Sequence, residues 1–409
     1  MKENPHFPSK RLWIITELYY PEETSTGYYM TRIAEGLAED FEVSVLCGQP
    51  AYSARGTIAP KQEIHKGVNI YRAAGTTLDK NIIVFRLINM VTLGLSILLK
   101  AIRNFRRGDR VLVVTTPPSL PFIAAFASLI RGSSYTLLIH DNYPEILLAV
   151  GKLSERSLLV QCINYCNRWL YKYARKIIVV GRDMRELVTK KVEGLEIPIA
   201  EIPNWAELET VEPAPRSLNP LLEELGLTDK FVLLYAGNMG HPNDLETIVE
   251  CAESLVEFPQ IHFVFLGSGV KKPWLEGERS RRNLTNITLL DPLPRSEQGV
   301  FLNACDVGIV SLISRMWGVS MPSRTYNILA AGKPILALAD GGSEVARVVE
   351  EHHVGRVVNP GDAEQLRRVI LEMYENRETL VDMGQRAREA ALDKYSLTTA
   401  VLQYREELN

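Results

Sequence analysis

Ser320, Pro322 and Arg324 combine the signals for a helix start with a positively charged side chain. A Ser can cap a helix and a Pro suits its first turn, so we expect a helix that begins at Ser320. The unpaired N–H groups of a helix start attract anions, and a guanidinium group can form paired bonds to a phosphate. These residues therefore indicate an anion-binding site; the alternative is an ordinary helix that leaves Arg324 in solvent.

The residues after Arg324 indicate that this helix stops and a buried strand follows. Gly332 suits the left-handed position past a helix end, and Pro334 prevents the helix from continuing. The apolar run from Ile335 to Leu338 predicts a strand that is covered on both faces. The stretch is therefore typical of one helix–strand unit in an α/β domain.

Three more loops of the C-terminal half follow predicted strands. Gly237 and Asn238 lie in one loop and Gly267 in the next, where a backbone without side chains can approach an anion closely. Leu293 lies in a loop with two prolines, which is rigid enough to hold a flat ring. Each loop is a weak signal alone, since glycine after a strand mostly makes turns. Their order along the chain, together with the stretch above, favours one ligand site.

The N-terminal half also places polar or flexible residues directly after predicted strands. They are Ser25, Thr26 and Gly27 in one loop, and His140 and Asp141 in another. Ligands of open α/β sheets bind at the carboxyl ends of the strands, so we expect His140 and Asp141 to face a ligand. The alternative for His140 is a histidine that only packs at the end of its strand.

Strands and helices alternate along the whole chain, which predicts the α/β fold class with two parallel sheets. The proline-rich segment 207–220 has almost nothing to bury and is the best candidate for a domain boundary. We therefore expect a Rossmann-like domain at 1–206, a linker at 207–220, a second Rossmann-like domain at 221–390 and a final helical segment at 391–409. The two domains would face each other across a cleft.

The composition argues against several classes of function. The 409 residues include 46 basic and 49 acidic ones, and a net charge of −3 argues against nucleic-acid binding. The five cysteines form no Cys-x-x-Cys pair and no Asp-x-Asp sequence occurs, so we expect no metal site. Residues 1–10 lack the apolar core of a signal peptide, and we expect a cytoplasmic protein.

Residues 82–102 are rich in Ile, Leu, Val and Met and raise the question of a membrane span. Two charged residues and an Asn interrupt this run, which leaves less than the ~20 apolar residues that a span requires. One interpretation is a long helix packed against a sheet. The other is a helix whose outer face, with the basic cluster at 103–110, touches anionic lipid, giving a peripheral contact with the inner membrane through 82–110.

The motifs of both halves resemble those of a known family. Four motifs of the C-terminal half resemble the donor half of the family 4 retaining glycosyltransferases. They are Ala-Gly-Asn-Met-Gly at 236–240, Leu-Gly-Ser-Gly at 266–269, Asp-Pro-Leu-Pro at 291–294 and Pro-Ser-Arg-Thr-Tyr-Asn at 322–327. Asp-Asn-Tyr-Pro-Glu at 141–145 and Ile-Pro-Asn-Trp at 202–205 resemble the bacterial capsule, exopolysaccharide and O-antigen branch of that family. The resemblance covers nearly the whole chain.

This resemblance implies the GT-B fold, with a C-terminal helix at 391–409 that packs back on the N-terminal domain. It implies metal-independent transfer of a sugar, with retention at the anomeric carbon, from a nucleoside diphosphate sugar. By family habit the donor would be a UDP-sugar, and the acceptor a lipid-linked saccharide or an oligosaccharide. The enzyme would need no cofactor and would build a bacterial surface polysaccharide at the cytoplasmic face of the inner membrane.

The resemblance also implies roles for individual residues. His140 and Asp141 would face the reacting sugar as catalytic residues, and Val319 and Ser320 would contact the donor sugar. The donor diphosphate would be bound by Ser25, Thr26, Gly27, Ser320, Met321 and Arg324, with backbone amides offered from Val319 to Met321. The ribose and base would be bound by Gly237, Asn238, Gly267, Leu293 and Asn327.

Four positions depart from the family pattern. Val319 and Asn327 stand where members usually carry two Glu, and Asn238 and Asn243 stand where they carry Arg and Lys. A neutral amide forms hydrogen bonds about half as strong as those of a carboxylate, so we expect weaker nucleotide binding. Arg324 would then be the main cation, with Arg315 and His241 as further candidates.

Two other readings share this fold. A nucleotide-sugar epimerase would leave no acceptor product, and a sugar phosphorylase would need orthophosphate. The non-enzymatic alternative is a subunit that binds a nucleotide sugar without turnover, and the two missing Glu residues are the feature that favours it.

Overall fold

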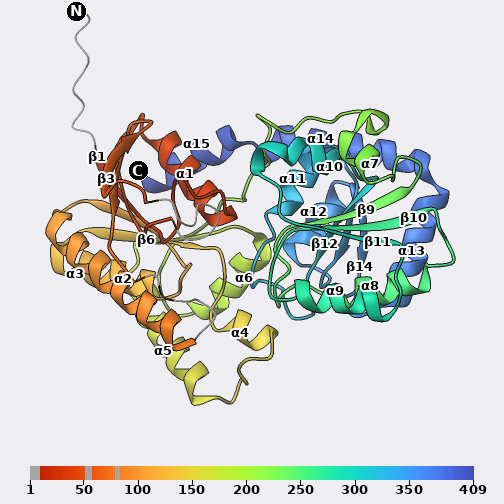
Figure 1. Cartoon of the computed structure of the whole chain (residues 1–409). Helices are drawn as coiled ribbons and strands as arrows, with labels where there is room; N and C mark the ends of the chain where they lie inside the picture. Colours follow the sequence, from red (N-terminus) through yellow and green to blue (C-terminus); the bar gives the residue numbers. More distant parts are fainter. Residues whose placement is uncertain (1–9, 51–57, 77, 79–82) are drawn as a thin grey trace, which may run out of the picture.

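Two parallel sheets with helices on both faces form the two domains of the computed structural model, which describes residues 10–50, 58–76, 78 and 83–409. In Figure 1 the N-terminal domain is red to yellow-green and the C-terminal domain is green to blue. The predicted α/β class with two parallel sheets is confirmed. Residues 1–9, for which no signal peptide is predicted, lie outside the described residues.

The N-terminal sheet has the strand order β3-β4-β2-β1-β5-β6-β7-β8 and is parallel apart from the antiparallel β3–β4 pair. Its central strand β1 is buried from Leu12 to Ile15, as expected for a strand covered on both faces. The strands are β1 (Lys10–Ile15), β2 (Phe41–Cys47), β3 (Gln62–His65), β4 (Val68–Arg72), β5 (Arg110–Val114), β6 (Ser134–Ile139), β7 (Lys176–Val179) and β8 (Ile199–Glu201). The helices are α1 (Ser25–Leu37), α2 (Ile83–Asn104), α3 (Leu120–Arg131), α4 (Glu145–Ala149), α5 (Leu158–Lys172) and α6 (Arg182–Lys191).

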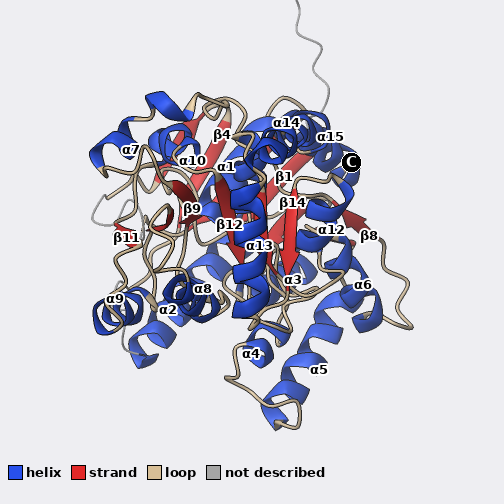
Figure 2. Cartoon of the chain, turned by 90° about the vertical axis from the view of Figure 1, so that its right-hand side faces the viewer, coloured by secondary structure: helices blue, strands red, loops and turns tan. Residues whose placement is uncertain are grey.

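The C-terminal sheet has the order β11-β10-β9-β12-β13-β14 and is parallel. Figure 2 shows α13 lying in front of this sheet. The strands are β9 (Phe231–Ala236), β10 (Ile261–Leu266), β11 (Ile287–Leu290), β12 (Val307–Ser311), β13 (Ile335–Leu338) and β14 (Gly355–Val358). The helices are η1 (Arg216–Leu218), α7 (Pro220–Glu224), α8 (Leu245–Ser254), α9 (Lys272–Arg281), η2 (Arg295–Glu297), α10 (Gln298–Asn303), α11 (Arg324–Ala330), α12 (Glu344–Glu351) and α13 (Ala363–Glu375).

The chain ends in two helices that lie on different domains. Helix α14 (Arg377–Lys394) packs against α11, and α15 (Leu397–Leu408) packs against α1 of the N-terminal domain. Gly36 permits this contact, because a Cβ at that position would lie 2.5 Å from Cγ2 of Val401. An ion pair of 2.6 Å between Arg405 and Asp40 adds to it.

The predicted helix start at Ser320 is wrong. Helix α11 begins at Arg324, with Ser323 before it, and Ser320 instead forms an antiparallel bridge with Asp141. The residue before a proline is disfavoured in the helical region, so Pro322 opposes a helix that would include Met321. The predicted end is confirmed, since Gly332 has φ of +62° and β13 starts at Ile335.

A few residues of the segment 207–220 are buried. Val211 is fully buried, and its carbonyl accepts a 2.8 Å hydrogen bond from Arg388 of α14. Glu207 is also buried. Most of the segment is nevertheless exposed, as its composition indicates, and its buried residues are Glu207, Val211 and Asn219.

Helix α2 is 22 residues long and lies on the surface of the N-terminal domain against α3. Within it, residues 87–104 form the one stretch of the described chain that is long and apolar enough to cross a membrane, with a mean hydropathy of 1.3. This stretch includes Lys100 and Arg103, so its uninterrupted apolar run remains shorter than the one a span requires, as the sequence indicates. One side of the helix is nevertheless in the core, since Ile97 and Ala101 are fully buried.

Candidate active site

The loop after β1 leads into α1 and points the start of this helix at the C-terminal domain. Thr24 caps the helix, its hydroxyl accepting a 3.4 Å hydrogen bond from the backbone N–H of Gly27. A Cβ on Gly27 would lie 2.7 Å from the carbonyl oxygen of Glu22, so only glycine fits this tight loop. Ser25 and Thr26 therefore stand in the first turn of α1, where the helix dipole is positive.

Ser25 meets the C-terminal domain directly. Its hydroxyl lies 2.9 Å from the hydroxyl of Ser323, the residue that precedes α11. The start of α1 and the residue before α11 thus meet where the two domains are in contact. The positive ends of the two helices are brought together, which favours an anion between them.

Arg324 lies on a surface formed by the loop after β9. Its guanidinium carbon is 4.3 Å from the ring centroid of Tyr235, and Nη2 donates a 3.3 Å hydrogen bond to the carbonyl of Asn238. Its Nη1 atom is buried and has no hydrogen-bond partner among the described residues. An unpaired buried donor of a charged group is costly, so Nη1 is suited to bind an anionic ligand.

The two glycine loops support this surface through their backbones. Gly237 has φ of +142°, and a Cβ there would lie 3.0 Å from the guanidinium carbon of Arg324. A Cβ on Gly267 would lie 2.0 Å from the carbonyl oxygen of Gly237. The loops can therefore pack together, and Arg324 can lie against them, only because both positions are glycine.

The carbonyl of Asn238 is a shared acceptor in this region. It accepts hydrogen bonds from the Tyr235 hydroxyl at 2.7 Å and from Nδ2 of Asn243 at 3.0 Å, besides that from Arg324. Asn243 is buried, so its side chain orders the loop. His241 is exposed beside it.

The carboxyl end of β6 touches the loop between β12 and α11 in the other domain. Asp141 bridges to Ser320, and the backbone N–H of Asn142 donates a 2.8 Å bond to the carbonyl of Val319. Nδ2 of Asn142 donates a 2.7 Å bond to the carbonyl of Gly318. His140 and Asp141 are thereby brought to the residues predicted to contact the donor sugar.

Burial changes the protonation of both predicted catalytic residues. It lowers the pKa of His140 to about 4, so the imidazole is neutral at pH 7, and its Nε2 atom is buried without a partner among the described residues. Burial raises the pKa of Asp141 to about 6, against an opposing effect of the neighbouring Thr116 hydroxyl, which lowers it. The site thus offers a neutral imidazole that is available for hydrogen bonding and a carboxyl group that titrates close to neutral pH.

Three predicted residues are engaged in ways that the sequence did not indicate. The side chain of Val319 is buried and its N–H donates to the carbonyl of Met316 at 3.0 Å, so this amide is already bonded within its own loop. Asn327 is buried, and its Oδ1 accepts a 3.3 Å bond from the N–H of Glu207. Met321 is also buried. Leu293 and Thr26 are partly exposed.

Sequence reasoning missed a second contact between the domains. The guanidinium carbon of Arg295 lies 3.5 Å from the ring centroid of Tyr28 in α1, and the Tyr28 hydroxyl donates to the carboxylate of Glu207. Arg295 directly follows the loop that was predicted to hold the base. Its position in the sequence could therefore have indicated a role at this site. The contact lies beside Asn327, which bonds to the backbone of the same Glu207.

A third contact lies behind the bridge of Asp141. Oδ2 of Asp183, at the start of α6, accepts hydrogen bonds of 3.0 Å from the N–H groups of Gly318 and Glu344. Arg182 forms ion pairs of 2.9 Å with Glu344 and 2.7 Å with Glu351 of α12. These bonds hold the loop 312–323 against the N-terminal domain.

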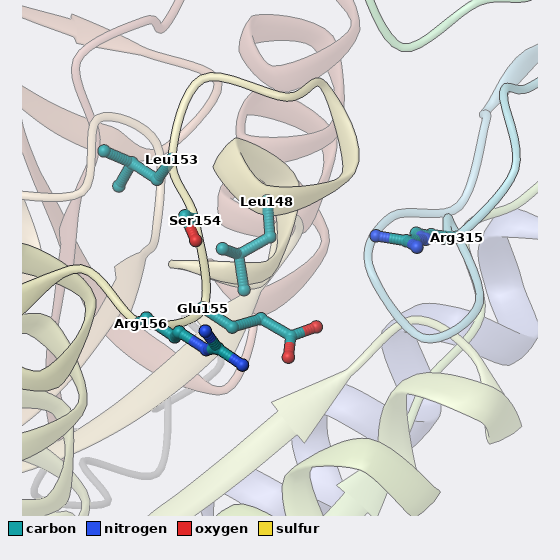
Figure 3. Close-up of a pocket in the computed structure, with 6 residues that line it drawn as sticks. All are labelled: Leu148, Leu153, Ser154, Glu155, Arg156 and Arg315. Atoms are coloured by element: carbon teal, nitrogen blue, oxygen red, sulfur yellow. The ribbon is translucent and has the colours of Figure 1, made fainter.

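A cavity of about 420 Å³ opens elsewhere along the cleft. Figure 3 shows Arg315 facing, across this space, the segment that carries Glu155 and Arg156. Arg315 is exposed and has φ of +69°. Among the described residues, the cavity is lined by Leu148, Leu153, Ser154, Glu155, Arg156 and Arg315, so it is separate from the residues around Arg324. Unpaired buried nitrogens lie instead on Arg324 and His140, one in each domain.

The arrangement can hold an anionic leaving group at one end and a neutral polar ligand at the other. Positive charge comes from Arg324 and the start of α1, and hydrogen bonding comes from His140 and Asp141. In the described part of the chain, no three His, Cys, Asp or Glu side chains gather as metal ligands would.

Comparison with known proteins gives consistent relatives. Residues 221–390 match the family model described as glycosyl transferases group 1. The chain is 30% identical over 373 residues to the probable glycosyltransferase WbjE of Pseudomonas aeruginosa, covering 89% of this chain and 90% of that protein. It is 25% identical over 347 residues to the putative colanic acid biosynthesis glycosyl transferase WcaI of Escherichia coli K12, covering 81% and 84%.

Two solved structures have the same fold at low identity. Sucrose-phosphate synthase from Thermosynechococcus elongatus has a TM-score of 0.79 at 15% identity, covering 97% of this chain and 98% of that one. Anabaena HepE in complex with UDP-glucose has a TM-score of 0.71 at 15% identity, covering 97% and 99%. The predicted GT-B architecture is confirmed.

Proposed function

Since the chain belongs to the group 1 glycosyl transferases, we propose that it transfers a sugar from a nucleoside diphosphate sugar with retention at the anomeric carbon. The observation that carries this proposal is the bridge between Asp141 and Ser320. It places His140, with an unpaired buried nitrogen, beside the loop that leads to Arg324. A donor in this cleft would have its sugar near His140 and its diphosphate near Arg324.

The proposed reaction occurs on one face of the sugar. The bond between the anomeric carbon and the diphosphate oxygen breaks, and the acceptor oxygen bonds to the same face of that carbon. The departing diphosphate oxygen takes the acceptor proton, so no other base is required. Arg324 and the start of α1 would stabilise the charge that develops on the diphosphate, and closure of the cleft would exclude water.

The positively charged groups around the proposed diphosphate site support a reaction that needs neither a metal nor a cofactor. The guanidinium group and helix dipole can neutralise a leaving diphosphate, the role that Mg²⁺ has in other sites. Transfer is therefore expected to persist in EDTA. A transfer rate restored only by added divalent cation would contradict this part of the proposal.

The donor and product are proposed from the relatives. HepE binds UDP-glucose with the same fold, which supports a UDP-sugar donor here. WcaI is described as acting in colanic acid biosynthesis, which supports a role in a bacterial surface polysaccharide. We therefore propose a lipid-linked saccharide acceptor, with the protein at the cytoplasmic face of the inner membrane.

The first test is a nucleotide panel read by thermal shift, followed by release of sugar from the matching donors. UDP should stabilise the protein more than GDP or ADP, and Arg324→Ala should remove this preference. Arg368→Ala, which changes an exposed arginine of α13, should retain it. No shift with any nucleotide at millimolar concentration would contradict the donor site.

A second pair of variants tests for turnover. His140→Ala should abolish slow sugar release while leaving the UDP shift intact, since the imidazole is placed at the sugar. His262 is the matched control, because burial also lowers its pKa to about 4 but it bonds to Thr288 within the C-terminal sheet. His262→Ala should retain sugar release. UDP binding without any release in the parent protein would favour the non-catalytic binding subunit.

A further inference from the structure

The outer surface of the N-terminal domain carries apolar side chains on three neighbouring helices. On α2 the exposed fractions are 54% for Val91, 56% for Leu95 and 69% for Leu99. These residues recur every four positions and form one stripe, whereas Ile97 and Ala101 on the other side of the helix are in the core. The stripe is thus a solvent-facing surface of a helix that is already packed.

The stripe continues onto α3 and α5. Helix α3 packs beside α2 and also contacts α5, and in Figure 1 the three helices lie on the lower left of the N-terminal domain. The exposed apolar residues that these two helices add are Phe126, Leu129, Ile130, Leu158, Leu159, Tyr165 and Trp169. An exposed apolar surface of this extent marks an interaction site, since monomeric proteins rarely leave one open.

The charged side chains on these three helices are all basic. Residues 87–108 include Lys100, Arg103, Arg106 and Arg107 and no acidic residue, although the whole chain has a net charge of −3. Helix α3 contributes Arg131, and α5 contributes basic residues and likewise no acidic one. Arg103, Arg106 and Arg107 are exposed at the end of the stripe. An apolar stripe bordered by basic side chains complements the surface of an anionic bilayer.

We propose that the α2–α3–α5 surface is the membrane-docking face, which lies in the headgroup region of an anionic bilayer with α2 parallel to the membrane plane. A spanning orientation would remove Ile97 and Ala101 from the core of the domain. A two-fold dimer through this face would bring the same basic cluster into the interface twice, which is unfavourable. The helix is about 33 Å long by its 22 residues, enough to extend across several lipids.

The position of α5 connects this docking face to the cleft. Leu158 is 80% exposed at the start of α5, and it comes two residues after Arg156, which lines the cavity opposite Arg315. An acceptor held in the bilayer would therefore lie near the cavity mouth when the face is docked. The docking face specifies how the protein would lie at the membrane. It rests on the proposed function only for the identity of the acceptor.

Flotation of the purified full chain with vesicles tests the docking face without any transfer reaction. The protein should float with vesicles that contain phosphatidylglycerol and remain behind with phosphatidylcholine alone, and salt should weaken binding. The triple variant Val91→Asn/Leu95→Asn/Leu99→Asn should lower the partition coefficient about a hundredfold, about fivefold for each side chain. The composition-matched control is Val381→Asn/Leu392→Asn/Leu402→Asn, on exposed sites of α14 and α15, and it should float as the parent does.

A second set of variants tests the charge. Lys100→Gln/Arg103→Gln/Arg107→Gln should also lower the partition coefficient about a hundredfold, since each basic residue near an anionic surface contributes about fivefold. The charge-matched control changes exposed residues of the C-terminal domain and is Arg279→Gln/Arg368→Gln/Lys394→Gln. Equal losses in the test and control variants would contradict the proposal.

A fluorophore on Cys162 reports the orientation. This cysteine of α5 is exposed, whereas Cys47, Cys251 and Cys305 are buried, and Cys166→Ser removes the remaining partly exposed thiol. An environment-sensitive label should shift to the blue on phosphatidylglycerol vesicles. An unshifted label, a parent protein that stays in the soluble fraction, or a dimer that the apolar triple variant converts to a monomer would each overturn the proposal. Sugar release measured on the same samples without vesicles separates these outcomes from failure of the donor site.

Discussion

Replacing Gly237 by Ala should damage nucleotide binding through Arg324, a residue that is far away in sequence. Gly237 has φ of +142°, a conformation that L residues rarely adopt. A Cβ there would lie 3.0 Å from Cζ of Arg324, 3.1 Å from Nη2 and 3.3 Å from Nε. The guanidinium group would have to leave its place over Tyr235 and against the Asn238 carbonyl.

The expected losses can be separated into stability and affinity. Backbone strain in the Gly237→Ala variant should lower the free energy of unfolding by about 1–3 kcal/mol. A charge-assisted bond from Arg324 to the diphosphate is worth about 1.5–3 kcal/mol, so displacing the group should raise the Kd for UDP about 10- to 100-fold. Arg324→Ala should raise the Kd by a similar factor without the strain.

Urea unfolding and calorimetric titration with UDP measure the two quantities. The control is Gly226→Ala, because Gly226 has φ of +65° and its Cβ would meet no described atom within 4 Å. This control should lose about 1 kcal/mol of stability, the cost of a left-handed Ala, and keep its affinity for UDP. It therefore separates general strain from displacement of Arg324.

The double variant Gly237→Ala/Arg324→Ala completes the test. If the Gly237→Ala substitution acts through the guanidinium group, it should cost no further affinity once Arg324 is absent, and the two effects should be strongly non-additive. Additive losses would refute the reasoning. Parent-like affinity in the single Gly237→Ala variant would refute it as well.

Two further predictions concern pH and the return of the C-terminal helix. Because burial raises the pKa of Asp141 from 3.8 to about 6, the stability of the fold should fall as pH rises between these values, so Asp141→Asn should raise the urea midpoint more at pH 8 than at pH 4. The same substitution should remove an acidic limb near pH 6 from the pH profile of kcat/KM. A limb that persists in Asp141→Asn would show that it belongs to another group. Gly36→Ala should lower the free energy of unfolding by about 1–3 kcal/mol, since its Cβ would lie 2.5 Å from Val401. Adding Val401→Ala in a double variant should restore part of this loss. An undiminished loss would show that the two residues do not interact.

The sequence predicted those parts of the fold that depend on local interactions. Asp244, Ser343 and Asp362 have residue types that suit a helix start, and each accepts a hydrogen bond from the first turn of its helix. The buried strand from Ile335 is similarly indicated by its own apolar run and by Gly332 before it. Such features involve residues within a few positions of one another, so their pattern is visible in one sequence.

The features that the sequence did not reveal depend on contacts between distant segments. The bridge from Asp141 to Ser320 joins the two domains and keeps Ser320 out of a helix, although its residue type suits a cap. Val211 and Glu207 are buried only because other segments fold over them. Asn142 had its place in a recognised motif, yet its bond to Gly318 depends on how the domains face each other. No periodicity within one segment records these arrangements.

The chain passes between the domains twice, and the two passages are joined. The first is the segment after β8, and the second lies between α14 and α15; the N–H of Ala206 in the first donates a 2.8 Å hydrogen bond to the carbonyl of Tyr395 in the second. A single tether would let one domain swivel in any direction, whereas two adjacent tethers restrict it to a swing about the line through them. On such a swing, the contacts Ser25–Ser323 and Asp141–Ser320 would separate and re-form together, so both parts of the domain interface would open at once.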